Sequence, residues 1–318
     1  MRHPLSVTIA ALVPLVLASL MTGAARVDIF AALSDPWAML VLMESRLPRT
    51  LAVLLTGAAL SVAGMLLQAL VRNRFVGPDT VGTAESAALG LLAVTLLAPA
   101  IPIWGKIMIA SLSALTGTAL FVAVIQRLPP REIMLVPITG IVLSGVIGSV
   151  VVYIAWQADL MQYLTTWLMV GEFSGIIAGR YEILWIAGAA AGLAWFAADR
   201  FAILALGEEV ATGLGLGTRG IMQLGLITVS LVTAMVVTTV GMIPFVGLIV
   251  PNIVSRIMGD NLRQSLPMVA TAGAALLLGC DLAGRLLRHP FEIPVGTVMG
   301  FVGAGIFLYL LYRRPARV

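Results

Sequence analysis

The sequence has little charge. Asp, Glu, Lys and Arg make up 11% of its 318 residues, whereas a soluble domain averages about 25%, and 60% of the residues are hydrophobic. The mean hydropathy is +1.06. Such a chain cannot hide its apolar surface in one core, so lipid must be its solvent. The apolar runs are long and continuous, which excludes the short alternating strands of a transmembrane β-barrel.

Residues that bind metals or carry catalysis are also scarce. Cys280 is the single cysteine, and the two histidines, His3 and His289, lie far apart in the sequence. An internal disulfide is therefore excluded, and a metal site is not expected. The chain has no GxxxxGK[ST] phosphate loop and no Ser/His/Asp set, so we expect neither ATP binding nor enzymatic activity. The net charge of +4 comes from arginines in short loops, which does not favour nucleic-acid binding.

Apolar segments follow one another along the chain, and we predict that about ten of them are transmembrane helices. They run approximately over 5–25, 48–71, 81–97, 106–126, 133–156, 181–198, 220–240, 245–258, 266–287 and 295–312. The first segment could alternatively be a cleaved signal peptide, but a transmembrane helix is favoured because the segment is about long enough to span the membrane. Residues 27–44 and 157–180 are interpreted as interfacial connections. The GxxxG pair Gly188 and Gly192 predicts close helix packing.

The loop charges predict the orientation. With the N-terminus placed in the cytoplasm, twelve of the 19 Lys and Arg residues lie inside and seven outside. This bias has the sign expected for two cytoplasmic termini. It also places the polar stretch Leu206–Arg219 in the cytoplasm. The seven outer cations exceed what orientation alone requires, so some of them are expected to have another role.

Several motifs then resemble one family across nearly the whole chain. The motifs are Arg46-Leu47-Pro48-Arg49 with Gly57, Gly64 and Gln68, Leu206-Gly207-Glu208 with Leu214-Gly215, the run from Gly241 to Asn252, Asp281-Leu282-Ala283-Gly284-Arg285, and Glu292-Ile293-Pro294-Val295-Gly296. Together they are similar to FecCD-type permeases, the membrane subunits of ABC importers for iron-siderophores, haem and vitamin B12.

The resemblance implies an all-α polytopic membrane protein with the vitamin B12 permease-like fold of type II ABC importers. Residues 1–318 would form one transmembrane permease domain. The implied partners are a second permease subunit, identical or a sister chain, two ATP-binding cassette ATPases and a periplasmic or lipid-anchored binding protein. ATP and Mg would bind the ATPases, with no cofactor on this chain. The location would be a bacterial inner membrane.

The resemblance also assigns residues to the two ends of the molecule. Cytoplasmic coupling helices are expected at 199–219, between helices six and seven, with these residues taking part: Gly207, Glu208, Glu209, Ala211, Gly213, Gly215 and Arg219. The alternative is a solvated loop with glycines at helix ends. Binding-protein docking is expected at Arg46, Arg49 and Arg285, because guanidinium groups hold carboxylates bidentately. Alternatively these arginines are interfacial anchors, and Arg285 merely pairs with Asp281 one helical turn earlier.

A further set of residues is predicted to lie beside the translocation pathway. The backbone break Gly77, Pro78, Asp79 and Thr80 is a candidate cytoplasmic gate, since irregular backbone at membrane depth must be buried or line a cavity. A plain inter-helix turn is the alternative. Gln68 and Asn252 either face the pathway or bond neighbouring helices.

Two departures from the usual motifs of the family indicate which of its branches this chain resembles. Asn73-Arg74-Phe75-Val76 replaces the usual Asn-Pro-Leu-Ala, and Pro251-Asn252 replaces Pro-His. The combination looks like the branch that serves petrobactin- and anguibactin-type siderophores, so a ferric siderophore is the expected cargo, moved by alternating access. Haem or vitamin B12 is the alternative within the family. An ion-coupled secondary transporter is the alternative from another class, and it requires ionisable residues in mid-membrane, which the sequence hardly shows.

Overall fold

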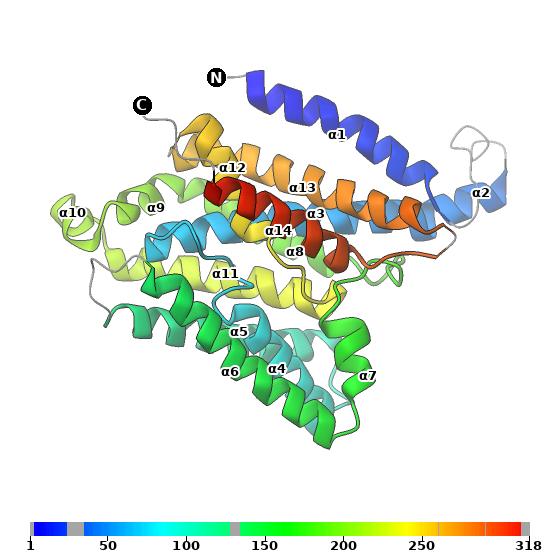
Figure 1. The fold of residues 1–318 in the computed structure, drawn as a ribbon, viewed down its shortest axis with the longest axis horizontal. Helices are drawn as coiled ribbons and strands as arrows, with labels where there is room; N and C mark the ends of the chain where they lie inside the picture. The colour runs from blue at the N-terminus through cyan, green and yellow to red at the C-terminus, as the bar shows by residue number, and fades with distance from the viewer. Residues whose placement is uncertain (1–2, 24–34, 128–133, 260, 290, 313–318) are drawn as a thin grey trace.

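In the computed structural model, all regular secondary structure of the described residues is helical; the description omits residues 1–2, 24–34, 128–133, 260, 290 and 313–318 (Figure 1). The α-helices are α1 (His3–Met21), α2 (Pro36–Val41), α3 (Leu47–Val71), α4 (Thr83–Leu97), α5 (Ile103–Ile125), α6 (Leu135–Gln157), α7 (Met161–Tyr163), α8 (Ile183–Phe196), α9 (Ala198–Ala205), α10 (Glu208–Gly213), α11 (Thr218–Val240), α12 (Val246–Met258), α13 (Leu262–Leu287) and α14 (Val295–Tyr312). Two π-helical turns, Leu42–Arg46 and Leu164–Leu168, follow α2 and α7. Residues 27–34 of the predicted connection and residue 133, the first of the predicted span 133–156, lie outside the described residues.

The number of spans agrees with the prediction of about ten. Six helices in the described residues are long and apolar enough to cross a membrane, and the bent pair α8–α9 makes a seventh. Three shorter apolar helices, α1, α4 and α12, bring the total to ten. The chain is therefore a multi-pass membrane protein.

One boundary differs from the sequence prediction. Residues 36–44, predicted as part of an interfacial connection, belong instead to one helical segment with α3, Pro36–Val71. Asp35 begins it by accepting a hydrogen bond from the Trp37 amide, and Pro36 occupies the first turn, where its missing N–H costs nothing. The polar residues of this stretch had suggested a loop, but they lie at the start of a helix.

Helix α3 is the centre of the molecule and packs against α13, α12, α11 and α8. Glycines allow the closest approaches. A Cβ on Gly57 would lie 2.4 Å from the Gly273 carbonyl oxygen of α13, and one on Gly64 would lie 1.8 Å from the Gly247 carbonyl oxygen of α12. In lipid the association of helices depends on such close packing rather than on the hydrophobic effect. These glycines therefore hold the core together.

Helix α6 lies at the edge of the molecule and exposes an apolar face (Figure 1). Ile141, Val142, Val146 and Tyr153 are all more than half exposed. On its opposite side a Cβ on Gly140 would lie 2.4 Å from the Thr80 carbonyl oxygen. The exposed face of α6 is therefore covered by lipid or by another protein.

Candidate functional site: a coupling knob, an arginine cluster and a gate loop

The predicted coupling segment forms a compact knob at one end of the molecule (Figure 1). The chain bends by 67° between α8 and α9, and α9, α10 and the start of α11 then fold against one another. Gly207 precedes α10 with φ of 120°, and Gly215 follows it with φ of 78°. Only glycine adopts such angles without strain, so these two glycines set the turns of the knob.

The predicted coupling residues are distributed over the surface and the interior of the knob. Glu208 and Glu209 are exposed in the first turn of α10, where the helix dipole favours negative charge. Gly213 and Arg219 are exposed as well. Ala211, in contrast, is fully buried, so it packs the knob internally and cannot touch a partner.

Sequence reasoning missed the apolar surface of this knob. Leu206, Val210 and Leu214 are 66%, 48% and 66% exposed and recur every four residues. Exposed leucines among polar residues at the end of a helix bundle are typical of a protein-interaction surface. The four-residue spacing is present in the sequence, but the prediction rested on the charges and glycines of the segment.

The three predicted docking arginines lie together at the end of the molecule opposite α10, and they form a cluster with two carboxylates (Figure 1). Arg49 Nη2 is 2.8 Å from Asp281 Oδ1, and Arg49 Nη1 is 2.7 Å from Glu292 Oε2. Arg285 Nη2 is 2.6 Å from Asp281 Oδ2, so Asp281 is shared by two guanidinium groups. The pairing of Arg285 with Asp281, which the sequence left open, is present.

The same cluster holds the end of α1. Arg285 donates to the Ser19 and Thr22 carbonyl oxygens and to Ser19 Oγ, and Arg46 donates to the Leu20 carbonyl oxygen. The last carbonyls of a helix lack intrahelical partners, and cations near them are favourable. The arginine cluster therefore ties α1 to α3 and α13.

The side chains of the arginine cluster differ in their exposure to solvent. The side chains of Arg285 and Asp281 are 3% and 1% exposed, and Arg46 is 6% exposed as a residue. Arg49 is 14% exposed and Glu292 29% exposed, so this pair faces outward. An external carboxylate can reach Arg49 most directly, from the side that Glu292 occupies.

The six predicted gate and pathway residues also come together, around the start of α12. Gly77 and Thr80 close the turn on themselves: the Thr80 amide donates to the Gly77 carbonyl and the Gly77 amide to Thr80 Oγ1. Asp79 Oδ2 accepts a 2.8 Å hydrogen bond from the Phe245 amide. Phe245 has φ of 67°, which is uncommon for a bulky residue and marks local strain.

Gln68 and Asn252 complete this connection through the backbone. Gln68 Nε2 donates to the Val76 and Leu248 carbonyls, and Asn252 Nδ2 donates to the Arg74 and Leu248 carbonyls. Both amides therefore bond neighbouring segments, as one of the two alternatives predicted. The result is a cross-linked unit of α3, the 72–82 loop and α12.

Among the described residues, no group of three or more His, Cys, Asp and Glu side chains is placed to hold a metal ion. Glu85 was overlooked as an ionisable residue within an apolar segment. It occupies the first turn of α4, a position that the helix dipole favours for a carboxylate.

Comparison with known proteins agrees with this architecture. The model of the FecCD transport family matches residues 10–313. The chain is 40% identical over 275 residues to the petrobactin import system permease protein YclN of Bacillus subtilis, covering 86% of this chain and 87% of that protein. It is 37% identical over 276 residues to the ferric-anguibactin transport system permease protein FatD of Vibrio anguillarum, covering 87% and 88%.

A solved structure shows the same fold. It is described as an inward-facing conformation of a metal-chelate type ABC transporter, and it superposes with a TM-score of 0.81 at 24% identity, covering 96% of this chain and 99% of that chain. The family match extends over almost the whole sequence, and the helical architecture agrees with it. The chain therefore belongs to the FecCD transport family and is a non-catalytic, multi-pass membrane permease subunit of an ABC importer.

Proposed function

We propose that this permease moves a ferric siderophore across a bacterial inner membrane by alternating access, with both of its termini in the cytoplasm. The observation that carries the substrate class is the similarity over most of the chain to permeases named for petrobactin and ferric-anguibactin. Iron would travel inside its organic chelate, so the chain needs no metal ligands of its own. Haem and vitamin B12 remain the competing cargoes within the family.

The energy would come from two separate ATPases that bind ATP and Mg and act on the knob formed by α9 and α10. Support comes from the exposed Val210 and Leu214 beside Glu208 and Glu209, an apolar strip next to an acidic one. Such a surface fits a groove of apolar character with a basic rim. Gly207 and Gly215 would set the direction of the knob, and Ala211 would keep it rigid.

The contribution of the exposed strip can be tested with Val210→Asp in the complete complex. We expect this variant to lower the stimulation of ATP hydrolysis by the permease and to reduce co-purification of the ATPases, because a charge enters the apolar contact. Thr212→Asp is the matched control, since Thr212 is an exposed polar residue of the same helix. Equal behaviour of the two variants would exclude the apolar strip as the contact.

A binding protein would dock at the opposite end, with Arg49 as its principal contact. Because Glu292 already pairs with Arg49, a carboxylate of the binding protein would take the place of Glu292. Arg46 and Arg285 would support the site by holding α1, since both are buried and bound to its carbonyls. Glu292→Gln should therefore strengthen binding-protein association severalfold, whereas Glu44→Gln, at an exposed carboxylate near the same end, should not.

The cross-linked unit around Gly77–Thr80 would act at the cytoplasmic gate. Its hydrogen bonds join α3 to α12, so the two helices would move as one body when the knob is displaced. A second permease subunit would cover the exposed face of α6, either an identical chain or a sister chain. The pathway would then lie between the two subunits.

The decisive experiment is reconstitution in proteoliposomes with the ATPases and the binding protein. We expect uptake of an iron-loaded siderophore to require ATP and to continue when the proton gradient is dissipated. Haem and cobalamin serve as competing substrates. Uptake that follows a proton or sodium gradient without ATP would establish the secondary-transporter alternative instead.

A further inference from the structure

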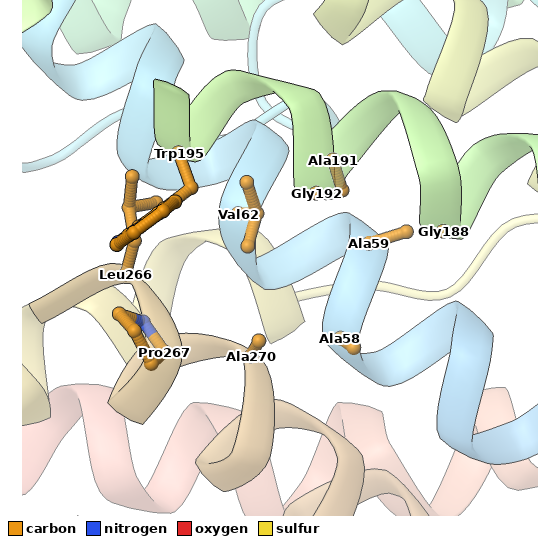
Figure 2. A pocket seen from close by; sticks show the side chains of 10 residues that line it. All are labelled: Ala58, Ala59, Val62, Gly188, Ala191, Gly192, Trp195, Leu266, Pro267 and Ala270. Carbon is orange, nitrogen blue, oxygen red and sulfur yellow. The ribbon is translucent and has the colours of Figure 1, made fainter. Parts of the chain in front are cut away.

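Two cavities follow one another along a single face of α3. The first has a volume of about 170 Å³ and is lined almost entirely by apolar and small residues, including Ala58 and Val62 of α3, Gly188 and Gly192 of α8, and Ala270 of α13 (Figure 2). An apolar cavity of roughly 150 Å³ stays dry and admits a six-carbon molecule. This apolar cavity is therefore suited to a hydrocarbon chain.

Gly188 and Gly192 both line the apolar cavity, but only Gly188 lies close to a neighbouring helix. No atom lies within 4 Å of a Cβ placed on Gly192, and the nearest atom to one on Gly188 is a flexible Leu55 methyl group at 2.9 Å. Gly192 is also exposed. Gly188 therefore packs against Leu55 of α3, as its spacing predicts for a helix contact, whereas Gly192 leaves the apolar cavity open between α8 and α13.

The second cavity has a mixed lining that includes basic residues. It has a volume of about 300 Å³ and is lined by Met65 and Ala69 of α3, by Arg72, which caps the end of α3, and by Arg74. Among the described residues its lining contains two arginines and no carboxylate. No ion pair of Arg72 occurs within the described part of the chain. This basic cavity is suited to an anion.

Four residues of α3 and its C-cap recur at helical spacing along the two cavities: Ala58, Val62, Met65, Ala69 and the cap residue Arg72. Steps of three and four residues keep them on one face of the helix. Fourteen residues of helix at 1.5 Å each span about 21 Å. Half of a bilayer with its headgroups measures about 20–22 Å, so the two cavities together have the length of one lipid leaflet.

An aromatic residue marks the depth of this face in the membrane. Trp195 lines the apolar cavity, and its Nε1 donates a 3.1 Å hydrogen bond to the Arg263 carbonyl oxygen. The Arg263 guanidinium lies 5.2 Å from the centre of the Trp195 ring. Tryptophan concentrates at the membrane–water interface. Trp195 is the second-last residue of α8, so it would place the change from the apolar to the basic cavity near the membrane surface.

We infer that this face of α3 binds one anionic phospholipid, with an acyl chain in the apolar cavity and the phosphate group at Arg72. The order of the cavities, their combined length and the position of Trp195 match such a lipid in a single leaflet. Basic pockets between transmembrane helices are a recognised type of site for lipid headgroups. The inference needs only the membrane location of the chain and stands apart from the proposed substrate.

The site would also bear on the coupling knob. Ala202, Ala205 and Leu206, at the end of α9, line the basic cavity. An Arg72 Nη1 atom lies 3.3 Å from the position of a Cβ on Gly207, where the chain turns into α10. A headgroup held by Arg72 would therefore contact the segment that joins α9 to α10, and its presence would restrict the movement of that segment.

Native mass spectrometry of the purified complex tests the inference. The probes are phosphatidylglycerol and phosphatidylethanolamine with the same acyl chains, added after delipidation. We expect preferential retention of phosphatidylglycerol, reduced roughly fivefold in Arg72→Gln, since a basic residue near anionic lipid contributes about 1 kcal/mol. Arg72→Lys should restore retention. Gly192→Leu should reduce retention of both lipids by filling the apolar cavity.

Matched controls separate this site from general lipid binding. Arg127→Gln removes an exposed arginine outside both cavities, and Gly305→Leu adds a side chain at another exposed helical glycine with no atom near its Cβ. Neither should change retention. Equal retention of the two lipids by the wild type, or unchanged retention in Arg72→Gln, would overturn the headgroup assignment, and unchanged retention in Gly192→Leu would overturn the acyl-chain site.

Discussion

Replacement of Asp281 by asparagine should destabilise the permease more than any other single charge removal in the arginine cluster. The Asp281 side chain is 1% exposed and lies between Arg49 at 2.8 Å and Arg285 at 2.6 Å. Removing one partner of a buried ion pair costs about 3–5 kcal/mol, because the remaining charge stays buried without compensation. Arg49 would keep Glu292, and Arg285 would keep the carbonyls of α1, so we expect the lower end, about 3 kcal/mol.

The measurement is equilibrium unfolding in mixed detergent micelles, followed by tryptophan fluorescence. Asp199→Asn is the matched control, because Asp199 and Arg263 form an ion pair with side chains 58% and 54% exposed, and such pairs contribute about 0–1 kcal/mol. The double variant Asp281→Asn with Arg285→Gln should recover part of the loss, since it removes the uncompensated cation as well. If Asp281→Asn costs no more than Asp199→Asn, Asp281 does not compensate the buried charge of Arg49 and Arg285 as the structure implies.

Three further substitutions test other contacts. Gly64→Ala would place a Cβ 1.8 Å from a backbone oxygen of α12, so it should lower the stability by about 1–3 kcal/mol or more. The control is Gly145→Ala, which should leave the stability unchanged because nothing lies within 4 Å of a Cβ there. Thermal unfolding of the two variants is the measurement. Asp79→Ala leaves the partly buried Phe245 amide at the start of α12 without its acceptor and should lower stability by about 1 kcal/mol by the same measurement. An unchanged stability would show that this hydrogen bond does not link the 72–82 loop to α12. Glu85→Gln should preserve ATP-driven uptake in proteoliposomes, since a helix-dipole contribution is only about 0.3–1 kcal/mol, and loss of uptake would assign Glu85 a transport role.

The spans themselves were predictable because each depends on local composition. About ten apolar stretches, long enough to cross a membrane and separated by Gly, Pro and Arg, are visible in the linear sequence. The glycines of the coupling segment are local as well: Gly207 and Gly215 take left-handed angles that other residues avoid. The boundary before α3 was wrong because Asp35 and Pro36 were interpreted as loop residues, although the same residues begin helices.

The partners of the charged and small residues could not be predicted, because they come from distant parts of the chain. Arg49 meets Asp281 across 232 positions, and Arg285 meets Ser19 across 266. The sequence around each arginine does not show whether its side chain binds the carbonyls of α1 or is available to a binding protein. In the same way, the spacing of Gly188 and Gly192 predicted helix packing, but only the separation of α8 from α13 made the pair a cavity wall.

The sequence by itself determined that this chain is a membrane protein, approximately how many times it crosses the membrane, and which family it resembles. These features are predictable because hydropathy, turn residues and motifs are properties of short segments. The tertiary structure decided which arginines are buried, that Ala211 lies inside the coupling knob, and that a basic cavity follows an apolar one along α3. Burial and cavity shape depend on how helices far apart in sequence pack together, and no segment carries that information alone.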